Sequence, residues 1–168
     1  GSLMFGTITV VGGGGNPGTL QFSTNSTSAA ENGGNKTITV TRTGGDDGPV
    51  SVAYETVNGS ATFPTDYIQT NNVLNWADND DNNKTFQVPI VNDSIEEPSQ
   101  SFTIRLSNPG GGATLGTNQV ITVTINDDDV SCSPCVADAN TLCLAGGPGD
   151  PNRFRVRVPW PDFAGASG

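Results

Sequence analysis

The chain contains no histidine and few basic residues, and both shortages exclude whole classes of function. Its 168 residues include seven Lys and Arg against 17 Asp and Glu, which gives a formal net charge of −10. A nucleic-acid-binding protein needs clustered positive charge to displace counterions from phosphate, and this chain has no such surplus. A histidine-ligated zinc site and a Ser-His-Asp triad both require an imidazole. We therefore expect no nucleic-acid partner and no histidine-based chemistry.

Strong helix formers and long apolar runs are also scarce. The chain has one Met and four Glu, only 33% of its residues are hydrophobic, and 22 residues are Gly. No segment approaches the roughly 20 consecutive apolar residues of a membrane-spanning helix. Val, Ile and Thr recur instead in short runs, and these residues favour strands. The composition predicts an all-β chain with no membrane span.

Short segments of period-two or continuous apolar character alternate with clusters of Gly, Asn, Asp and Pro. In 37–41, for example, the aliphatic side chains share one face and the threonines share the other, which is typical of a sheet with one buried face. This arrangement predicts a Greek-key β-sandwich. The predicted strands span 5–11, 20–23, 36–42, 50–57, 73–76, 84–91, 101–107, 119–125 and 154–158.

The chain divides into three parts. Residues 1–18 form an apolar strand arm and a glycine-rich linker, residues 19–129 form the globular body, and residues 130–168 contain all three cysteines and a last strand. Within the body, the polar run Asp78–Asn83 connects two strands that we expect to be antiparallel neighbours. Its spacing resembles the start of an EF-hand loop, but Asn83 replaces the required Gly and Pro89 stands where the closing Glu belongs. A polar hairpin turn is the better interpretation.

Acidic residues gather in the loops next to predicted strands. Strand ends of a Greek-key sandwich meet at two poles, so these loops can converge. Crowded carboxylates repel one another and raise one another's pKa, and a Ca²⁺ ion with its six to eight oxygen ligands relieves that repulsion. The alternative is a solvated surface rich in turn-favouring Asp, and spacing alone leaves both open. The acids concerned are Glu31, Asp66, Asp93, Glu96, Glu97, Asp127, Asp128 and Asp129.

Residues 19–129 also carry a series of motifs in a fixed order. They are 18–23, Glu31-Asn32-Gly33-Gly34 followed by 37–45, then 50–52, 58–62, Asp66-Tyr67, 73–76, 90–93 with Glu97, 101–107, 113–116 and 125–129. A body with these motifs resembles the Calx-β domain, the sandwich module of sodium–calcium exchangers, integrin β4 and many bacterial surface proteins. The resemblance implies an immunoglobulin-like Greek-key sandwich, with extra terminal strands in this chain. It also implies seven Ca²⁺ ligands, which are Glu31, Asp66, Asp93, Glu97, Asp127, Asp128 and Asp129.

Two positions depart from the calcium-sensing members of that family. Asn92 and Gln100 stand where those members carry acids. Fewer ligand charges mean fewer ions or weaker binding. We therefore expect one or two Ca²⁺ ions rather than a full cluster.

The three cysteines follow the body within a short stretch. Without histidine or a fourth cysteine a structural zinc site is disfavoured, and Cys132-Ser133-Pro134-Cys135 lacks the strand-to-helix context of a redox motif. A disulfide is the better interpretation and implies an oxidising, extracellular compartment. The expected pair is Cys135–Cys143, which closes a short loop in a stretch resembling cysteine-bracketed segments beside bacterial Calx-β repeats. Cys132 is then free or bonded to another chain.

The two terminal strands suggest self-association. The first is apolar, precedes a glycine tether and must add to a sheet to be stable. The last places three of the seven positive charges on one strand edge of an acidic protein, which favours docking onto an acidic neighbour within or between chains. The alternative is an ordinary two-faced strand that closes the chain's own sheet. The assembly residues are Phe5, Ile8, Val10, Arg153, Arg155 and Arg157.

Three functions follow from these features. The leading one is a calcium-binding extracellular structural protein of a bacterial cell surface, the subunit of a filament assembled by strand donation between subunits. The second is a monomeric adhesion or spacer module from a larger tandem Calx-β protein. The third is an enzyme that uses paired carboxylates, as glycosidases do. We expect no enzyme, because metal ligation explains the acids better.

Overall fold

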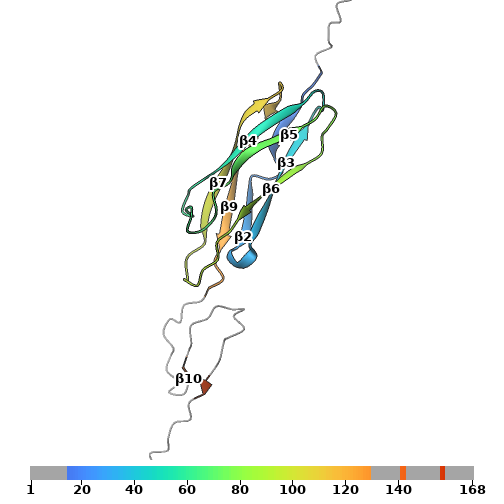
Figure 1. Cartoon of the computed structure of the whole chain (residues 1–168). Helices are drawn as coiled ribbons and strands as arrows, with labels where there is room; N and C mark the ends of the chain where they lie inside the picture. Colours follow the sequence, from blue (N-terminus) through green and yellow to red (C-terminus); the bar gives the residue numbers. More distant parts are fainter. Residues whose placement is uncertain (1–14, 130–140, 143–155, 158–168) are drawn as a thin grey trace, which may run out of the picture.

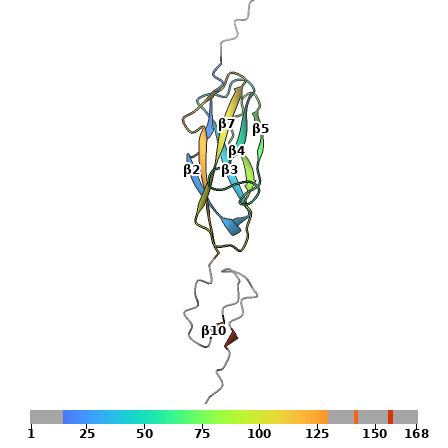
Figure 2. The same cartoon turned by 90° about the vertical axis from the view of Figure 1, so that its left-hand side faces the viewer.

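Two β-sheets pack face to face in the computed structural model, which describes residues 15–129, 141–142 and 156–157. One sheet has the order β6-β3-β1-β8 and the other β2-β9-β7-β4-β5 (Figures 1 and 2). The strands are β1 (Thr19–Phe22), β2 (Ser26–Ala30), β3 (Asn35–Thr43), β4 (Val50–Val57), β5 (Asn71–Trp76), β6 (Lys84–Pro89), β7 (Gln100–Gly110), β8 (Thr114–Leu115) and β9 (Val120–Asn126). The predicted all-β sandwich is confirmed.

Helical structure is minimal in the part of the chain that is described. A 3₁₀ helix, η1 (Glu31–Gly33), follows β2. Within the same residues, no helix is long and apolar enough to cross a membrane.

Alternating side chains from both sheets fill the space between them. On β3, Ile38 and Val40 are buried while Thr37 is exposed, and on β7, Phe102 and Ile104 are fully buried. Burying a side chain of this size stabilises a fold by about 1.5–3 kcal/mol. The period-two pattern therefore selects which face of each strand enters the core, and the predicted strands between 19 and 129 each match an observed strand.

Strands β2 and β8 are absent from the sequence-based prediction. The segment Ser-Thr-Ser-Ala-Ala of β2 has no apolar alternation, and it becomes a strand by parallel pairing with β9, from Ser26↔Thr122 to Ala30↔Asn126. The two residues of β8 pair in parallel with β1. Partners distant in sequence supply the hydrogen bonds of both strands, so local sequence gives little signal for either.

The terminal strands are described only in part. The strand predicted over 5–11 lies outside the described residues. Of the strand predicted over 154–158, the structure describes β11 (Val156–Arg157), which pairs antiparallel with β10 (Thr141–Leu142).

The prediction of a hairpin turn over 78–83 is wrong. Strand β5 pairs with β4 in one sheet and β6 pairs with β3 in the other, so Asp78–Asn83 crosses between the sheets. Side-chain contacts, rather than strand pairing, hold this loop in place. The indole Nε1 of Trp76 donates to the carbonyl of Asn82 at 2.7 Å, and Lys84 Nζ lies 2.7 Å from Asp80 Oδ2. The hydrogen bond from Lys84 lowers the pKa of Asp80 to about 2.

Arg42 on β3 is a buried cation that ties this loop to the start of the domain. Only 3% of the residue is exposed. Its guanidinium lies 2.9–3.2 Å from five backbone carbonyl oxygens to which it donates, those of Pro17, Ala77, Asp80, Asp47 and Gly48. Arginine offers five donors, so this site uses its full donor set on backbone groups. Arg42 thereby joins β3, the entering chain and two loops at one pole.

We expect Arg42→Lys to lower the free energy of unfolding by about 2 kcal/mol, because three donors cannot satisfy five partly buried acceptors and each unmet buried group costs roughly 1–3 kcal/mol. The matched control is Arg105→Lys on the exposed surface of β7, with an expected change below about 0.5 kcal/mol. Urea denaturation followed by circular dichroism measures both changes. Equal stability of the two variants would contradict the role given to Arg42.

Candidate metal centre

Segments distant in sequence bring acidic side chains to one end of the sandwich. Glu31 opens η1 directly after β2, and Asp66 lies in the loop between β4 and β5. Asp93 and Glu97 lie between β6 and β7, and 127–129 follow β9 directly. In Figure 1 this end, here called the acidic pole, lies opposite the end at which residues 15–18 enter the fold.

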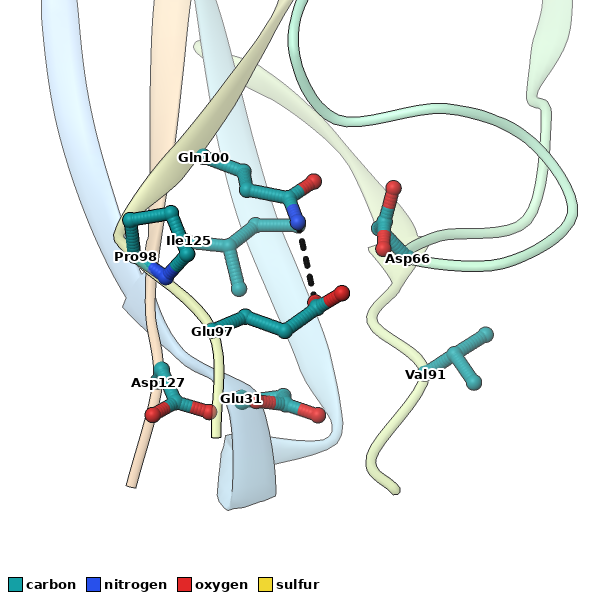
Figure 3. A pocket seen from close by; sticks show the side chains of 8 residues that line it. All are labelled: Glu31, Asp66, Val91, Glu97, Pro98, Gln100, Ile125 and Asp127. Carbon is teal, nitrogen blue, oxygen red and sulfur yellow. Dashed lines mark hydrogen bonds between the residues drawn. The ribbon is translucent and has the colours of Figure 1, made fainter. Parts of the chain in front are cut away.

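Distances and contacts place all seven predicted ligands at the acidic pole. A pocket is lined by Glu31, Asp66, Glu97 and Asp127 together with Gln100, Val91, Pro98 and Ile125 (Figure 3). One carboxylate oxygen each from Glu31, Asp93 and Asp129 lies within 4.8 Å of the other two. Asp128 Oδ2 accepts a hydrogen bond from Asn32 Nδ2 at 2.5 Å. The sequence-based grouping of the acids therefore matches their arrangement in space.

Glu31 is the buried member of the group. It is 7% exposed, and its Oε1 accepts the backbone N–H of Asp93 at 2.9 Å. Burial is the main cause that raises the pKa of Glu31 to about 7, and the neighbouring carboxylates of Asp127 and Asp93 raise it further against that hydrogen bond. A buried acid among other acids is stable as an anion only if positive charge is supplied.

Two further acids show the same crowding. Desolvation raises the pKa of Glu97, and the charges of Asp66, Asp93 and Asp127 add to the shift. Desolvation also raises the pKa of Asp129, with contributions from Asp127, Asp128 and Asp93. The sign of every neighbouring charge that acts on these groups is negative.

No basic side chain of the described body neutralises the acidic pole. Residues 15–129 contain 14 of the 17 acids and four of the seven bases, so the whole formal net charge of −10 lies there. Lys84 pairs with Asp80 in the only ion pair of the described residues. Lys36 donates to the carbonyl of Ser28, and Arg42 donates to carbonyls at the opposite pole.

Four buried oxygens at this pole have no hydrogen-bond partner. They are the only such buried side-chain atoms among the described residues: Gln100 Oε1, Asp127 Oδ1, Asp128 Oδ1 and Asp129 Oδ2. Buried polar atoms in folded proteins are nearly always satisfied, and a partnerless group costs free energy. All four are acceptors, so a cation or several donors would satisfy them together. This donor set fits a hard, oxygen-preferring metal ion.

Two residues of the pole are not among the predicted ligands. Gln100 stands where calcium-sensing members of the family carry an acid, and its Nε2 donates to Glu97 Oε2 at 2.9 Å (Figure 3). Its Oε1 has no hydrogen-bond partner, so this neutral residue still offers an oxygen to the site. Asn32 orients Asp128. Both lie inside quoted or discussed motifs, but neither carries a charge that would have marked it as a site residue.

The fold and this pole define an all-β sandwich domain with an unneutralised acidic loop cluster. The model of one family, the Calx-beta domain, matches residues 15–129, and the chain belongs to that family. The match starts four residues before the predicted start of the body.

Known relatives agree with this assignment. The chain is 34% identical over 99 residues to the sodium/calcium exchanger Calx of Drosophila melanogaster, covering 59% of this chain and 10% of the exchanger. The chain therefore matches only about a tenth of the length of that exchanger. The crystal structure of the apo-form Calx CBD1 domain matches with a TM-score of 0.64 and 32% identity over 66% of this chain and 97% of that one. The calcium binding domain CBD12 of CALX1.1 matches with a TM-score of 0.63 and 32% identity, over 66% of this chain and 46% of that one.

The remaining sequence-based predictions concern residues that the structure does not describe. The disulfide Cys135–Cys143, the state of Cys132 and the assembly residues Phe5, Ile8, Val10, Arg153 and Arg155 lie outside the described residues. Arg157 is described only as part of β11. These predictions stay open.

Without metal, we expect stability to fall as the pH rises from about 5 to about 8. Glu31 titrates near 4.5 in the unfolded chain and near 7 in the folded one, so in this window the unfolded state binds fewer protons. Stability declines with pH wherever that holds. Urea midpoints in EDTA measure the slope, and Glu31→Gln should flatten it. An unchanged slope in Glu31→Gln, or a slope of opposite sign, would contradict this origin.

Proposed function

We propose that residues 15–129 form a Ca²⁺-binding structural domain whose ligands lie at the acidic pole. The observation that carries the proposal is the group of partnerless buried oxygens beside carboxylates that no basic residue of 15–129 neutralises. The proposed ligands are Glu31, Asp66, Asp93, Glu97, Asp127, Asp128 and Asp129.

The donor set and its origin in loops favour Ca²⁺ over smaller ions. Ca²⁺ binds oxygens at about 2.3–2.6 Å in flexible geometry, so ligands on opposite sides of the ion lie about 5 Å apart. The oxygens of Glu31, Asp93 and Asp129 lie within 4.8 Å of one another, which one such ion can span. Mg²⁺ demands a tighter octahedron and keeps more of its water. Loop-supplied carboxylates that approach from several directions suit the larger ion.

One or two ions are consistent with this set. The first position lies between Glu31, Asp93 and Asp129. A second position would use the pocket side of the pole, where Glu97 and Asp66 face the neutral Gln100. Because a neutral ligand contributes less attraction than a carboxylate, this second position binds more weakly.

Bound Ca²⁺ would act by fixing loops rather than by catalysing a reaction. It would connect the end of β2, the end of β9 and the loop between β6 and β7, whose carboxylates otherwise repel. The name of the related CALX1.1 structure, a calcium binding domain, supports this assignment. We infer a non-enzymatic module of an extracellular or cell-surface protein, where ample Ca²⁺ suits sites of modest affinity.

The assembly role stays a prediction from the sequence. Strand donation depends on Phe5, Ile8 and Val10, outside the described residues, so the filament subunit and the monomeric spacer module both remain compatible with a Ca²⁺-binding body.

Calorimetric titration of the full, metal-stripped chain with CaCl₂ tests the proposal. We expect Ca²⁺ binding that Asp129→Asn weakens about tenfold or more, a typical loss when a metal site is disturbed. Asp81→Asn removes the same charge from an exposed loop position and should leave the affinity unchanged. Absence of binding heat together with an unchanged melting temperature in EDTA would overturn the proposal, as would equal weakening by both variants.

We also expect Gln100→Glu to tighten Ca²⁺ binding and to destabilise the metal-free protein. The new carboxylate adds a charged ligand to the pocket and, without an ion, another repulsive neighbour for Glu97. Gln119→Glu makes the same substitution at an exposed position away from the pocket and is the control. Calorimetry and melting temperatures in Ca²⁺ and in EDTA measure both effects. Equal behaviour of the two variants would remove Gln100 from the site.

A further inference from the structure

The first and last segments of the sandwich run parallel and are hydrogen-bonded along most of their length. β1 pairs in parallel with β8, and β2 pairs in parallel with β9. Backbone bonds continue between the strands, because the N–H of Phe22 donates to the Asn118 carbonyl at 2.8 Å and the N–H of Thr122 donates to the Asn25 carbonyl at 3.0 Å. Backbone bonds between residues 18–30 and residues 114–126 therefore continue from the β1–β8 pair in one sheet to the β2–β9 pair in the other, and together they are here called the ladder.

The two ends of this ladder lie at opposite poles. Residues 15–18 enter at one end of the sandwich and β9 leads out at the acidic pole, as both views show (Figures 1 and 2). Tension between the flanking segments of the chain would pull β2 and β9 in opposite directions along their own axes. In that direction all ladder bonds carry the load together, whereas a pull applied at one end of the pair would break them one after another.

Side chains anchor the ladder at each end. At the entry, Arg42 Nε donates to the carbonyl of Pro17 at 3.0 Å. At the exit, Asn32 Nδ2 donates to Asp128 Oδ2. These two residues are 96 positions apart in the sequence, the same separation as between Phe22 and Asn118 in the ladder. The side-chain contact at the acidic pole thus extends the backbone ladder in register.

We propose that residues 15–129 bear mechanical load along the chain, with segments 18–30 and 114–126 as a shear clamp. The clamp itself stands on strand pairing and on the position of the poles. A second element, that Ca²⁺ reinforces the clamp by bridging Glu31 to 127–129, rests on the proposed function.

Force spectroscopy on the full chain tests the clamp by comparing two pulling directions in EDTA. One set of handles is attached at the two termini, and the other at the N-terminus and at the exposed side chain of position 117, which precedes β9 and so leaves the β2–β9 pair outside the direct path of the force. We expect the terminal pull to need at least about twice the unfolding force, since forced unfolding reports the barrier in the loaded direction. Equal forces in the two directions would overturn the proposal.

A pair of proline variants on β2 separates the clamp from general stability. Lys36 Nζ donates to the Ser28 carbonyl at 2.6 Å, so the backbone N–H and C=O of Ser28 point away from β9. Because these groups alternate along a strand, those of Thr27 point toward β9. Thr27→Pro removes a ladder donor, whereas Ser28→Pro removes an N–H on the outer edge, where proline is tolerated. We expect Thr27→Pro to lose most of the excess force of the terminal pull and Ser28→Pro to keep it. The same loss in both variants would contradict the assignment of the ladder.

Repeating the terminal pull in CaCl₂ tests the second element. We expect a higher unfolding force than in EDTA, and Asp129→Asn should reduce the increase at CaCl₂ concentrations that only just saturate the unmodified chain. A difference between pulling directions in EDTA without any effect of Ca²⁺ would retain the clamp and reject its reinforcement. Calorimetry on the same samples then shows whether Ca²⁺ binding itself has failed.

Discussion

Mutual repulsion among carboxylates at the acidic pole is the constraint on which the rest of the structure depends. Glu31 is buried against the backbone of Asp93, and its pKa rises to about 7 because burial and like charges disfavour the anion. Each side chain of 127–129 has one buried oxygen without a hydrogen-bond partner. At neutral pH these carboxylates repel one another, and no basic side chain of residues 15–129 pairs with them.

At the opposite pole, a positively charged side chain of the protein itself is surrounded by hydrogen-bond acceptors. Arg42 places its guanidinium among five carbonyl oxygens, and its positive charge organises backbone from the entering segment and two loops. One end of the sandwich therefore has a built-in cation surrounded by acceptors, and the other has acceptors for which we propose an external cation. The parallel pairs β1–β8 and β2–β9 follow one another between the two poles, so an ion at the acidic pole would act on the second of these pairs.

Much of this arrangement could be predicted from the sequence, and the exceptions have physical causes. Period-two patterns located strands such as β3 and β4 because their alternate side chains are buried. The acids could be grouped because a sandwich gathers its strand ends at two poles, and the family resemblance selected the seven proposed ligands among them. The polar β2 could not be found, since its pairing partner lies about 96 residues away. The loop at Asp78–Asn83 was misassigned for a related reason: local polarity marks a turn but not whether the strands on either side share a sheet. Gln100 could be noted as a missing charge, but its partnerless oxygen depends on packing that the sequence does not encode locally.

A crystal structure of the full chain grown with CaCl₂, with anomalous scattering data, tests the central claim most directly. The account predicts an anomalous peak at the acidic pole within about 2.3–2.6 Å of oxygens from Glu31, Asp93 and Asp129. It also predicts that the partnerless oxygens of 127–129 turn toward an ion. An acidic pole that contains only water in saturating Ca²⁺, with its carboxylates spread apart into solvent, would contradict it.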